Sequence, residues 1–219
     1  MTVSWESSVR ANMYLTQRWA QTMRALNLEP TGKTTGLLRE LLWMYNQEGR
    51  YYHTTEHLQS CFEVMDSVIG PVSVTVELAL WYHDIVYNSR RKDNEVQSAL
   101  LARARLGLLS KDHLANHVAN LILCTKHDQN PPTVNAQVIQ DVDLSILGAS
   151  PEKFDAYEAA IRKEYAWVDE DSYRRVRGFI LQDFLAQFTI YHTPEFQISG
   201  YERRARENRA RSLDTLRPG

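Results

Sequence analysis

VTVELALWYHDIVY, residues 74–87, is the stretch that decides the fold. Apolar residues occupy nearly every face of a helix drawn through it, which is typical of a central helix surrounded by other helices. Its last turns carry His83 and Asp84 inside the apolar run. An ionised carboxylate buried beside Trp81 and Ile85 costs several kcal/mol unless a cation or strong hydrogen-bond donors compensate it. We therefore expect a compensating group at Asp84.

Helical spacing of apolar residues continues on both sides of this segment, and no stretch shows the sustained alternation expected of a half-buried strand. The pattern predicts an all-α fold. We find no repeat and no domain linker, which indicates a single domain over residues 1–219. The spacing, the capping residues and the Gly or Pro breaks predict helices over residues of about 4–27, 35–48, 54–69, 73–87, 94–107, 110–126, 135–147, 151–165, 173–190 and 201–213.

The composition is that of a soluble globular protein, with 43% hydrophobic and 24% charged residues among 219. A formal net charge of −2 gives no overall attraction to nucleic acid or to anionic lipid, so we expect neither partner. Cys61 and Cys124 lie within apolar helical patterns and form no close pair, which argues against a disulfide framework or a thiolate zinc site. No apolar run is long enough for a signal peptide or a membrane span, and we expect a cytoplasmic protein.

A metal ion is a natural compensating group for the buried aspartate. His83 and Asp84 differ by about 100° around a helix, yet at its C-terminal end both can lean toward one ion. His57, in the stretch YYHTTEHLQS at residues 51–60, is the natural third ligand because it flanks the apolar stripe of its own helix. A carboxylate is then expected as the fourth.

QDVDLSILG, residues 140–148, is the natural source of that carboxylate. Asp143 lies one residue before Leu144 and four before Leu147, next to the core-facing edge of the helix. Asp141 would point elsewhere and is the weaker candidate, with a supporting role beside the ligands as its alternative. The predicted metal ligands are His57, His83, Asp84 and Asp143.

The order of these residues resembles the HD superfamily of metal-dependent phosphohydrolases, which is named after the central His-Asp pair. The first histidine precedes the pair by 26 residues, and the last aspartate follows it by 59. RYYHTTEH, residues 50–57, is similar to the Arg-x-Tyr-His-x-x-x-His opening of a small family of HD phosphohydrolases and, more distantly, to cyclic-nucleotide phosphodiesterases. The resemblance covers about residues 50–147 and implies a helical bundle around the metal site. It also implies that metal-activated water hydrolyses a phosphate ester of a nucleotide or related small metabolite.

The resemblance implies roles for further residues. His53 corresponds to the phosphodiesterase histidine that protonates the leaving oxygen, which suits imidazole because it can titrate near neutrality. Glu95, in DNEVQSA, matches the family's NE..SA segment and is expected to position the attacking water, and Asp84 is expected to serve in catalysis as well as in metal binding. Arg50 and Lys126 are candidates for holding the substrate phosphate, Arg50 through a bidentate fork and Lys126 as a point charge.

Several alternatives stay open at this point. Two carboxylates and two imidazoles suit Mn²⁺, Fe²⁺, Ni²⁺, Co²⁺ or Zn²⁺, with Mg²⁺ as a further option. His127 is ambiguous, because HD proteins with two metals use extra histidines between the His-Asp pair and the last Asp; His113 and His117 are expected on an exposed helix face, so we favour one metal. An HD-fold di-iron oxygenase and a non-catalytic nucleotide- or metal-binding module are the alternative functions. The expected partner is a small phosphorylated substrate, and a homodimer stays open.

Overall fold

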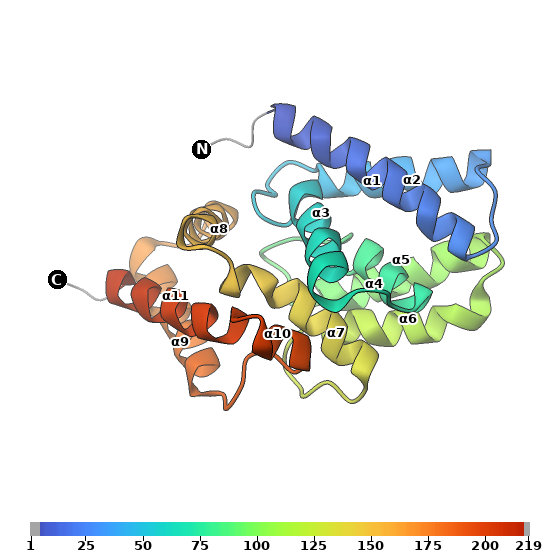
Figure 1. Cartoon of the computed structure of the whole chain (residues 1–219). Helices are drawn as coiled ribbons and strands as arrows, with labels where there is room; N and C mark the ends of the chain where they lie inside the picture. Colours follow the sequence, from blue (N-terminus) through green and yellow to red (C-terminus); the bar gives the residue numbers. More distant parts are fainter. Residues whose placement is uncertain (1–4, 217–219) are drawn as a thin grey trace.

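The computed structural model describes residues 5–216, and all regular structure in that range is helical (Figure 1). The predicted all-α fold is confirmed. Within the same range no helix has the length and apolar character needed to cross a membrane. The elements are α1 (Trp5–Ala25), α2 (Gly32–Tyr45), α3 (Thr55–Val64), η1 (Met65–Ile69), α4 (Val74–Tyr82), α5 (Asn94–Leu108), α6 (Asp112–Cys124), α7 (Val134–Asp143), η2 (Leu144–Gly148), α8 (Pro151–Glu164), α9 (Glu170–Ala186), α10 (Pro194–Ile198) and α11 (Tyr201–Leu216).

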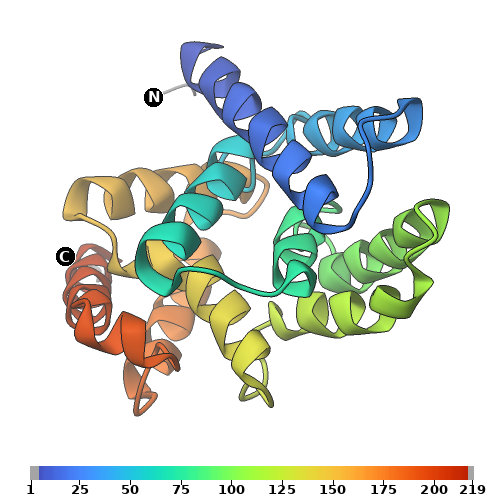
Figure 2. The same ribbon diagram turned by 45° about the vertical axis from the view of Figure 1, so that its right-hand side comes forward.

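α4 lies at the centre of the fold, in contact with α1, α3, α5, α6 and α7 (Figures 1 and 2). Val76 and residues 78–82 are all buried. Trp81 packs edge-on against Trp19 of α1, with 5.1 Å between ring centroids, and its indole N–H donates to the Thr22 hydroxyl. A helix buried on every side needs apolar residues on every side, so the sequence of α4 fixes its central place.

α3 and α7 both pack against α4 and against each other. The α3 stripe that includes Leu58, Cys61 and Phe62 is buried, as its spacing predicted. On α7, Ile139 and Val142 are fully buried. Packing of the two stripes holds the polar residues beside them near the C-terminal end of α4.

The predicted helix over residues 73–87 is shorter than expected. α4 ends at Tyr82, and His83 and Asp84 belong to the turn that follows. Carbonyl oxygens at and beyond the C-terminal end of a helix have no N–H partner within the helix, so they need other hydrogen-bond donors. The guanidinium of Arg50 supplies them, because it donates to the carbonyl oxygens of Asp84 and Ile85 at 2.7 Å each.

Other helix ends also differ from prediction. The expected helices over 54–69 and 135–147 finish in a π-helical turn, η1, and a 3-10 turn, η2. α9 begins at Glu170, because Asp169 is the N-cap and accepts a hydrogen bond from the backbone N–H of Ser172. α10 was not predicted, since its five residues are too few to show a period.

The C-terminal helices are fixed to α7 and η2 by two close contacts. The buried Asp141 carboxylate accepts hydrogen bonds from the backbone N–H groups of His192 and Thr193 and from the Thr193 hydroxyl, at 2.7 to 3.0 Å. These bonds attach α10 to α7. A Cβ at Gly148 would lie 2.7 Å from atoms of Tyr201, so only glycine permits this approach of α11 to η2.

Candidate metal centre

Four side chains from three parts of the chain meet at the C-terminal end of α4. His57 comes from the first turn of α3, and His83 and Asp84 from the turn after α4. Asp143 is the last residue of α7. The Nε2 atoms of the two imidazoles are 3.2 Å apart. The structure thus brings the four predicted ligands together.

The carboxylate oxygens complete the cluster. Asp84 Oδ2 lies 3.1 Å from Nε2 of His83 and 3.5 Å from Nε2 of His57. Asp143 Oδ1 lies 3.5 Å and 3.3 Å from the same two nitrogens. Ligand atoms about 2.0–2.2 Å from a metal lie roughly 2.8–3.1 Å from one another at octahedral angles and roughly 3.3–3.6 Å at tetrahedral angles. The observed separations therefore suit a single metal ion at the common centre.

Two contacts outside the cluster orient its ligand atoms. The Nδ1–H group of His83 donates to the Leu80 carbonyl oxygen at 2.7 Å, so Nε2 is the ring nitrogen that faces the cluster. His127 Nε2 contacts Asp143 Oδ2 at 2.8 Å, while the other oxygen of that carboxylate faces the imidazoles. Such partners hold ligands in the geometry that a metal requires.

The imidazole and carboxyl groups of the cluster shift one another's pKa values. Burial lowers the pKa of His83, but Asp84 and its neighbours outweigh burial and raise that pKa well above 6.5. Burial raises the pKa of Asp84, and His83 and His53 bring it well below 3.8. Without a cation, imidazole protons therefore balance the carboxylates. A divalent cation would take their place, so metal binding would release protons.

Cys61 places a sulfur beside the cluster, although its apolar helical pattern predicted no role at a metal site. His57, Cys61, His83 and Asp143 form a buried group that could hold a metal ion, with ligand atoms within 4.8 Å of one another. The Cys61 sulfur is 3.7 Å from both ring nitrogens of His57, so it lies against the ring and not in line with the Nε2 lone pair. Asp84 Oδ2 is closer to both Nε2 atoms, and we prefer it to the thiol as a ligand.

A cleft of about 490 Å³ opens onto the cluster. Asp84 and Asp143 form part of its wall, together with His53, Glu95 and Lys126. Burial raises the pKa of Glu95, and the nearby Asp84 and Asp143 add to the rise while Lys126 opposes it. A carboxylate with a raised pKa is a better proton acceptor near neutral pH. Three of the predicted catalytic or phosphate-binding residues thus share one cleft with the candidate ligands.

Arg50 faces the backbone and not the cleft. Its guanidinium donates to the carbonyl oxygens of His53, Asp84 and Ile85 at 2.7 to 2.9 Å. These bonds attach the loop before α3 to the turn after α4. Phosphate binding by Arg50 stays a prediction, and its contacts favour a structural role instead.

Glu164, which the sequence interpretation missed, holds His53 in the cleft. Its Oε2 atom contacts His53 Nδ1 and accepts from the Tyr87 hydroxyl, both at 2.7 Å. Its Oε1 atom accepts from the backbone N–H groups of Tyr51, Tyr52 and His53 at 2.7 to 3.1 Å. The His53 ring also stacks on Tyr87, with 4.0 Å between centroids. A carboxylate at Nδ1 makes this nitrogen a donor and leaves Nε2 for a substrate.

One signal in the sequence could have drawn attention to Glu164. It is the last residue of α8, where the helix dipole disfavours a negative charge. A residue that opposes a local rule often has a compensating contact elsewhere. Its partners Tyr51 and Tyr87 are 113 and 77 residues away in the sequence, so only the folded chain identifies them.

Acid should weaken the fold through Glu164. Burial alone would raise its pKa, but His53 and the other donors lower it from 4.5 to about 2. Because the folded-state pKa lies below the unfolded one, the stabilisation is complete above about pH 4.5 and is lost as the pH falls toward about 2. The shift corresponds to about 3 kcal/mol. Urea unfolding at about pH 5 and about pH 3 should show this loss.

The Glu164→Gln variant is the control for that measurement, because it has no carboxyl group to titrate at this position. Its free energy of unfolding should be lower at about pH 5 and should change less on acidification. A pH dependence equal to that of the parent would assign the acid sensitivity to other carboxylates.

The other histidines weighed for a second metal fall into two groups. His127 contacts Asp143, and its Nδ1 atom is buried without a hydrogen-bond partner among the described residues. His113 and His117 are exposed on α6 and do not line the cleft. Only one of these three histidines therefore reaches the cluster.

Comparisons of the chain with models of protein families, with curated proteins and with solved structures found no match. The class of the protein is therefore defined by its fold and its site alone. The described part of the chain is all-α and contains a group of His, Cys, His and Asp side chains that could bind a metal ion.

Proposed function

We propose that the protein is an HD-type, metal-dependent phosphohydrolase that acts on a phosphate ester of a nucleotide or related small metabolite. The convergence of the four predicted ligands carries the proposal: five separations between their atoms run from 3.1 to 3.5 Å. The same cleft holds His53 and Glu95, which the HD resemblance assigns to proton transfer and to the attacking water.

Each residue of the cleft would have a separate role in the reaction. A metal ion bound by the cluster would polarise a phosphoryl oxygen and supply hydroxide from bound water. Glu95 would orient the attacking water and accept its proton. His53 would protonate the leaving oxygen through Nε2 while Glu164 holds Nδ1. Lys126, exposed where it lines the cleft, would balance the charge of the phosphate.

A screen with chromogenic esters tests the proposal. p-Nitrophenyl phosphate reports a monoesterase and bis-p-nitrophenyl phosphate a diesterase, each with Mn²⁺, Fe²⁺, Ni²⁺, Co²⁺, Zn²⁺ or Mg²⁺ added. We expect turnover of at least one ester with at least one metal. Asp84→Asn, which keeps the size of the side chain and removes its charge, should abolish turnover. His117→Ala, at an exposed histidine on α6, is the matched control and should keep it. If the parent turns over neither ester with any of the metals, the proposal is refuted.

His53→Gln should lower kcat without changing the metal content, because His53 lies outside the four-ligand cluster. Loss of a general acid costs about 10²–10⁴-fold. The loss should be smaller for p-nitrophenyl phosphate, whose leaving group departs without a proton, than for an alkyl phosphate. Steady-state kinetics with both esters makes the comparison. Equal losses for the two would remove His53 from proton donation.

The same samples separate the two alternative functions. A di-iron oxygenase would need a further histidine besides His127, and it would consume oxygen when loaded with Fe²⁺. A binding module would take up metal or nucleotide in calorimetry and turn over no ester. An oxygen electrode and isothermal titration therefore complete the screen.

A further inference from the structure

α11 carries a fully buried arginine whose guanidinium has no hydrogen-bond partner. Arg209 is 0% exposed, and its Nε atom and both terminal nitrogens have no acceptor among residues 5–216. A guanidinium has five N–H donors and keeps its charge near neutral pH. Burial of such a group is costly unless other groups compensate it. An unsatisfied buried group of this kind points to a missing partner.

One face of this guanidinium packs on an aromatic ring. The Cζ atom of Arg209 lies 3.9 Å from the ring centroid of Phe184, in the last turn of α9. A cation–π contact of this kind uses the face of the guanidinium, whereas its N–H donors lie in the plane of the group. Burial lowers the pKa of Arg209 to about 10, and the nearby Arg177 adds to the fall. The contact with Phe184 therefore does not compensate the buried charge.

The carboxylates of this region already have partners. Glu158 of α8 pairs with Arg177. Glu202 of α11 pairs with Arg206 and also accepts hydrogen bonds from two backbone N–H groups. An anion from outside the chain is therefore the natural partner for Arg209.

The ring that covers Arg209 belongs to the wall of the cleft. Phe184 and Arg177 line the cleft at α9, and the candidate ligands Asp84 and Asp143 line the same cleft. Phe184 is partly exposed, whereas Arg209 is buried and does not line the cleft. One aromatic side chain thus contacts both the buried guanidinium and the space in which a substrate would lie.

We propose that Arg209 binds an anionic group of the substrate, a phosphate or a carboxylate, at the α9 end of the cleft after the Phe184 side chain turns aside. The inference rests on the proposed function and narrows it to substrates with a second anionic group besides the phosphate ester at the candidate metal centre. A bidentate anion would supply acceptors in the plane of the guanidinium and balance its charge. The stability lost by keeping Arg209 unpaired is then the cost of a prepared binding site.

Calorimetric titration with inorganic phosphate tests the site without metal or turnover. In protein treated with EDTA, Arg209→Met should lower the phosphate affinity by about 10–100-fold, the usual effect of losing hydrogen bonds to a charged group. Phe184→Ala removes the covering ring and should raise the affinity, because a site that is closed in most molecules binds more weakly in proportion.

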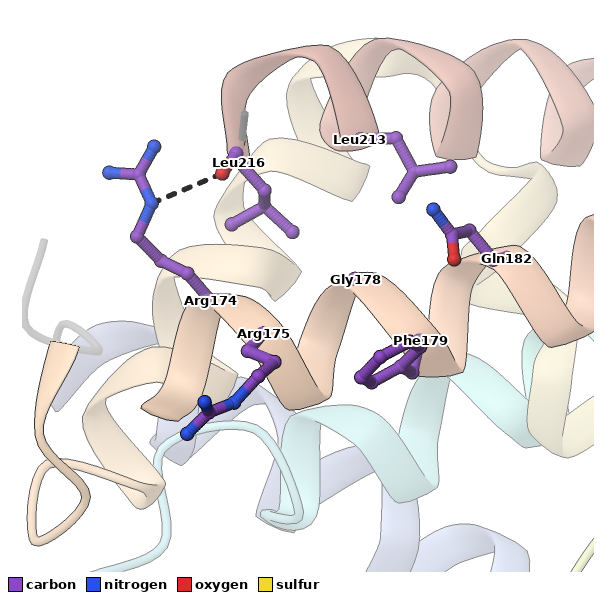
Figure 3. A pocket seen from close by; sticks show the side chains of 7 residues that line it. All are labelled: Arg174, Arg175, Gly178, Phe179, Gln182, Leu213 and Leu216. Atoms are coloured by element: carbon purple, nitrogen blue, oxygen red, sulfur yellow. Dashed lines mark hydrogen bonds between the residues drawn. The ribbon is translucent and has the colours of Figure 1, made fainter. Parts of the chain in front are cut away.

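Arg175→Met is the matched control for that titration. Arg175 is exposed on α9 and lines the groove between α9 and α11, not the cleft (Figure 3). Its loss should leave the phosphate affinity unchanged. No binding even by Phe184→Ala, or an affinity that Arg209→Met leaves unchanged in both backgrounds, would overturn the proposal.

Thermal unfolding separates a binding arginine from a structural one. A buried charge without acceptors disfavours folding, so Arg209→Met, which introduces an unbranched apolar side chain, should keep or raise the Tm. Phosphate should raise the Tm of the parent and not that of Arg209→Met. A lower Tm for Arg209→Met without phosphate would show that the guanidinium already has sufficient partners, and it would reject the proposed site.

The outcomes distinguish this site from the proposed hydrolase. Phosphate binding that depends on Arg209, in a protein that turns over no ester, would keep the anion site and reject the hydrolase. If the hydrolase is active, Arg209→Met should raise KM about 10–100-fold for an alkanediol bisphosphate and leave KM unchanged for the matching alkyl monophosphate. Equal changes for the two esters would reject the second anionic group and leave the hydrolase standing.

Discussion

His83→Ala should remove the metal from the candidate centre. We expect about one transition metal ion per parent chain and almost none in the variant. The Nε2 atom of His83 lies 3.1 to 3.5 Å from the other three ligand atoms, so its loss opens one side of the cluster. Changing a partner outside the ligands costs about 10–100-fold in metal affinity, and loss of a ligand should cost at least as much. Elemental analysis after dialysis against metal is the measurement.

A thermal shift with added Mn²⁺ or Zn²⁺ gives a second readout. Metal at about 100 times its dissociation constant adds about 2.7 kcal/mol to the free energy of unfolding, and only the parent should gain it. In weak buffer the parent should also release protons on binding, because the cation replaces those held by the imidazoles. His117→Ala, on an exposed face, should behave as the parent does. Equal metal in the parent and His83→Ala would place the ion elsewhere.

Glu164→Ala should destabilise the protein by about 3–5 kcal/mol. The change removes the acceptor for three backbone N–H groups and the Tyr87 hydroxyl, and it leaves these partly buried donors without that partner. For a chain of this size the loss corresponds to a fall in Tm of roughly 10 °C. Urea unfolding and calorimetry at neutral pH measure both quantities.

Two further variants show how much of that loss of stability is due to the Glu164 carboxylate. Glu152→Ala changes an exposed acid in the first turn of the same helix and should cost far less than Glu164→Ala. Glu164→Gln keeps an oxygen for the backbone donors and should fall between the two. If Glu164→Ala is no less stable than Glu152→Ala, water replaces the carboxylate and the loop that carries His53 has another support.

Local pattern accounts for most of the fold. The helices could be predicted from apolar spacing, and α4 could be placed at the centre because residues 74–82 are apolar on nearly every side. The same reasoning singled out Asp84 as a buried charge in need of compensation. His57 and Asp143 followed from their places beside the buried stripes of their own helices. Their roles as ligands stay predictions until metal is measured.

Contacts between distant residues account for what could not be predicted. α4 ends early because Arg50, far from it in sequence, satisfies the carbonyl oxygens of Asp84 and Ile85. Asp141 differs from Asp143 because α10 supplies it with backbone donors. Helical periodicity says which side of a helix faces the core, and it says nothing about which other segment will be there.

The sequence by itself determined the helices, their burial pattern and the residue types available to a metal site, because each depends on neighbours within a few turns. Only the tertiary structure decided which of those residues meet. The Nε2 atoms of His57 and His83 come within 3.2 Å, and Glu164 reaches His53, because three packed helices and a loop fix their directions. Likewise, only the packing of α11 against α9 shows that the Arg209 guanidinium is buried without an acceptor among the described residues.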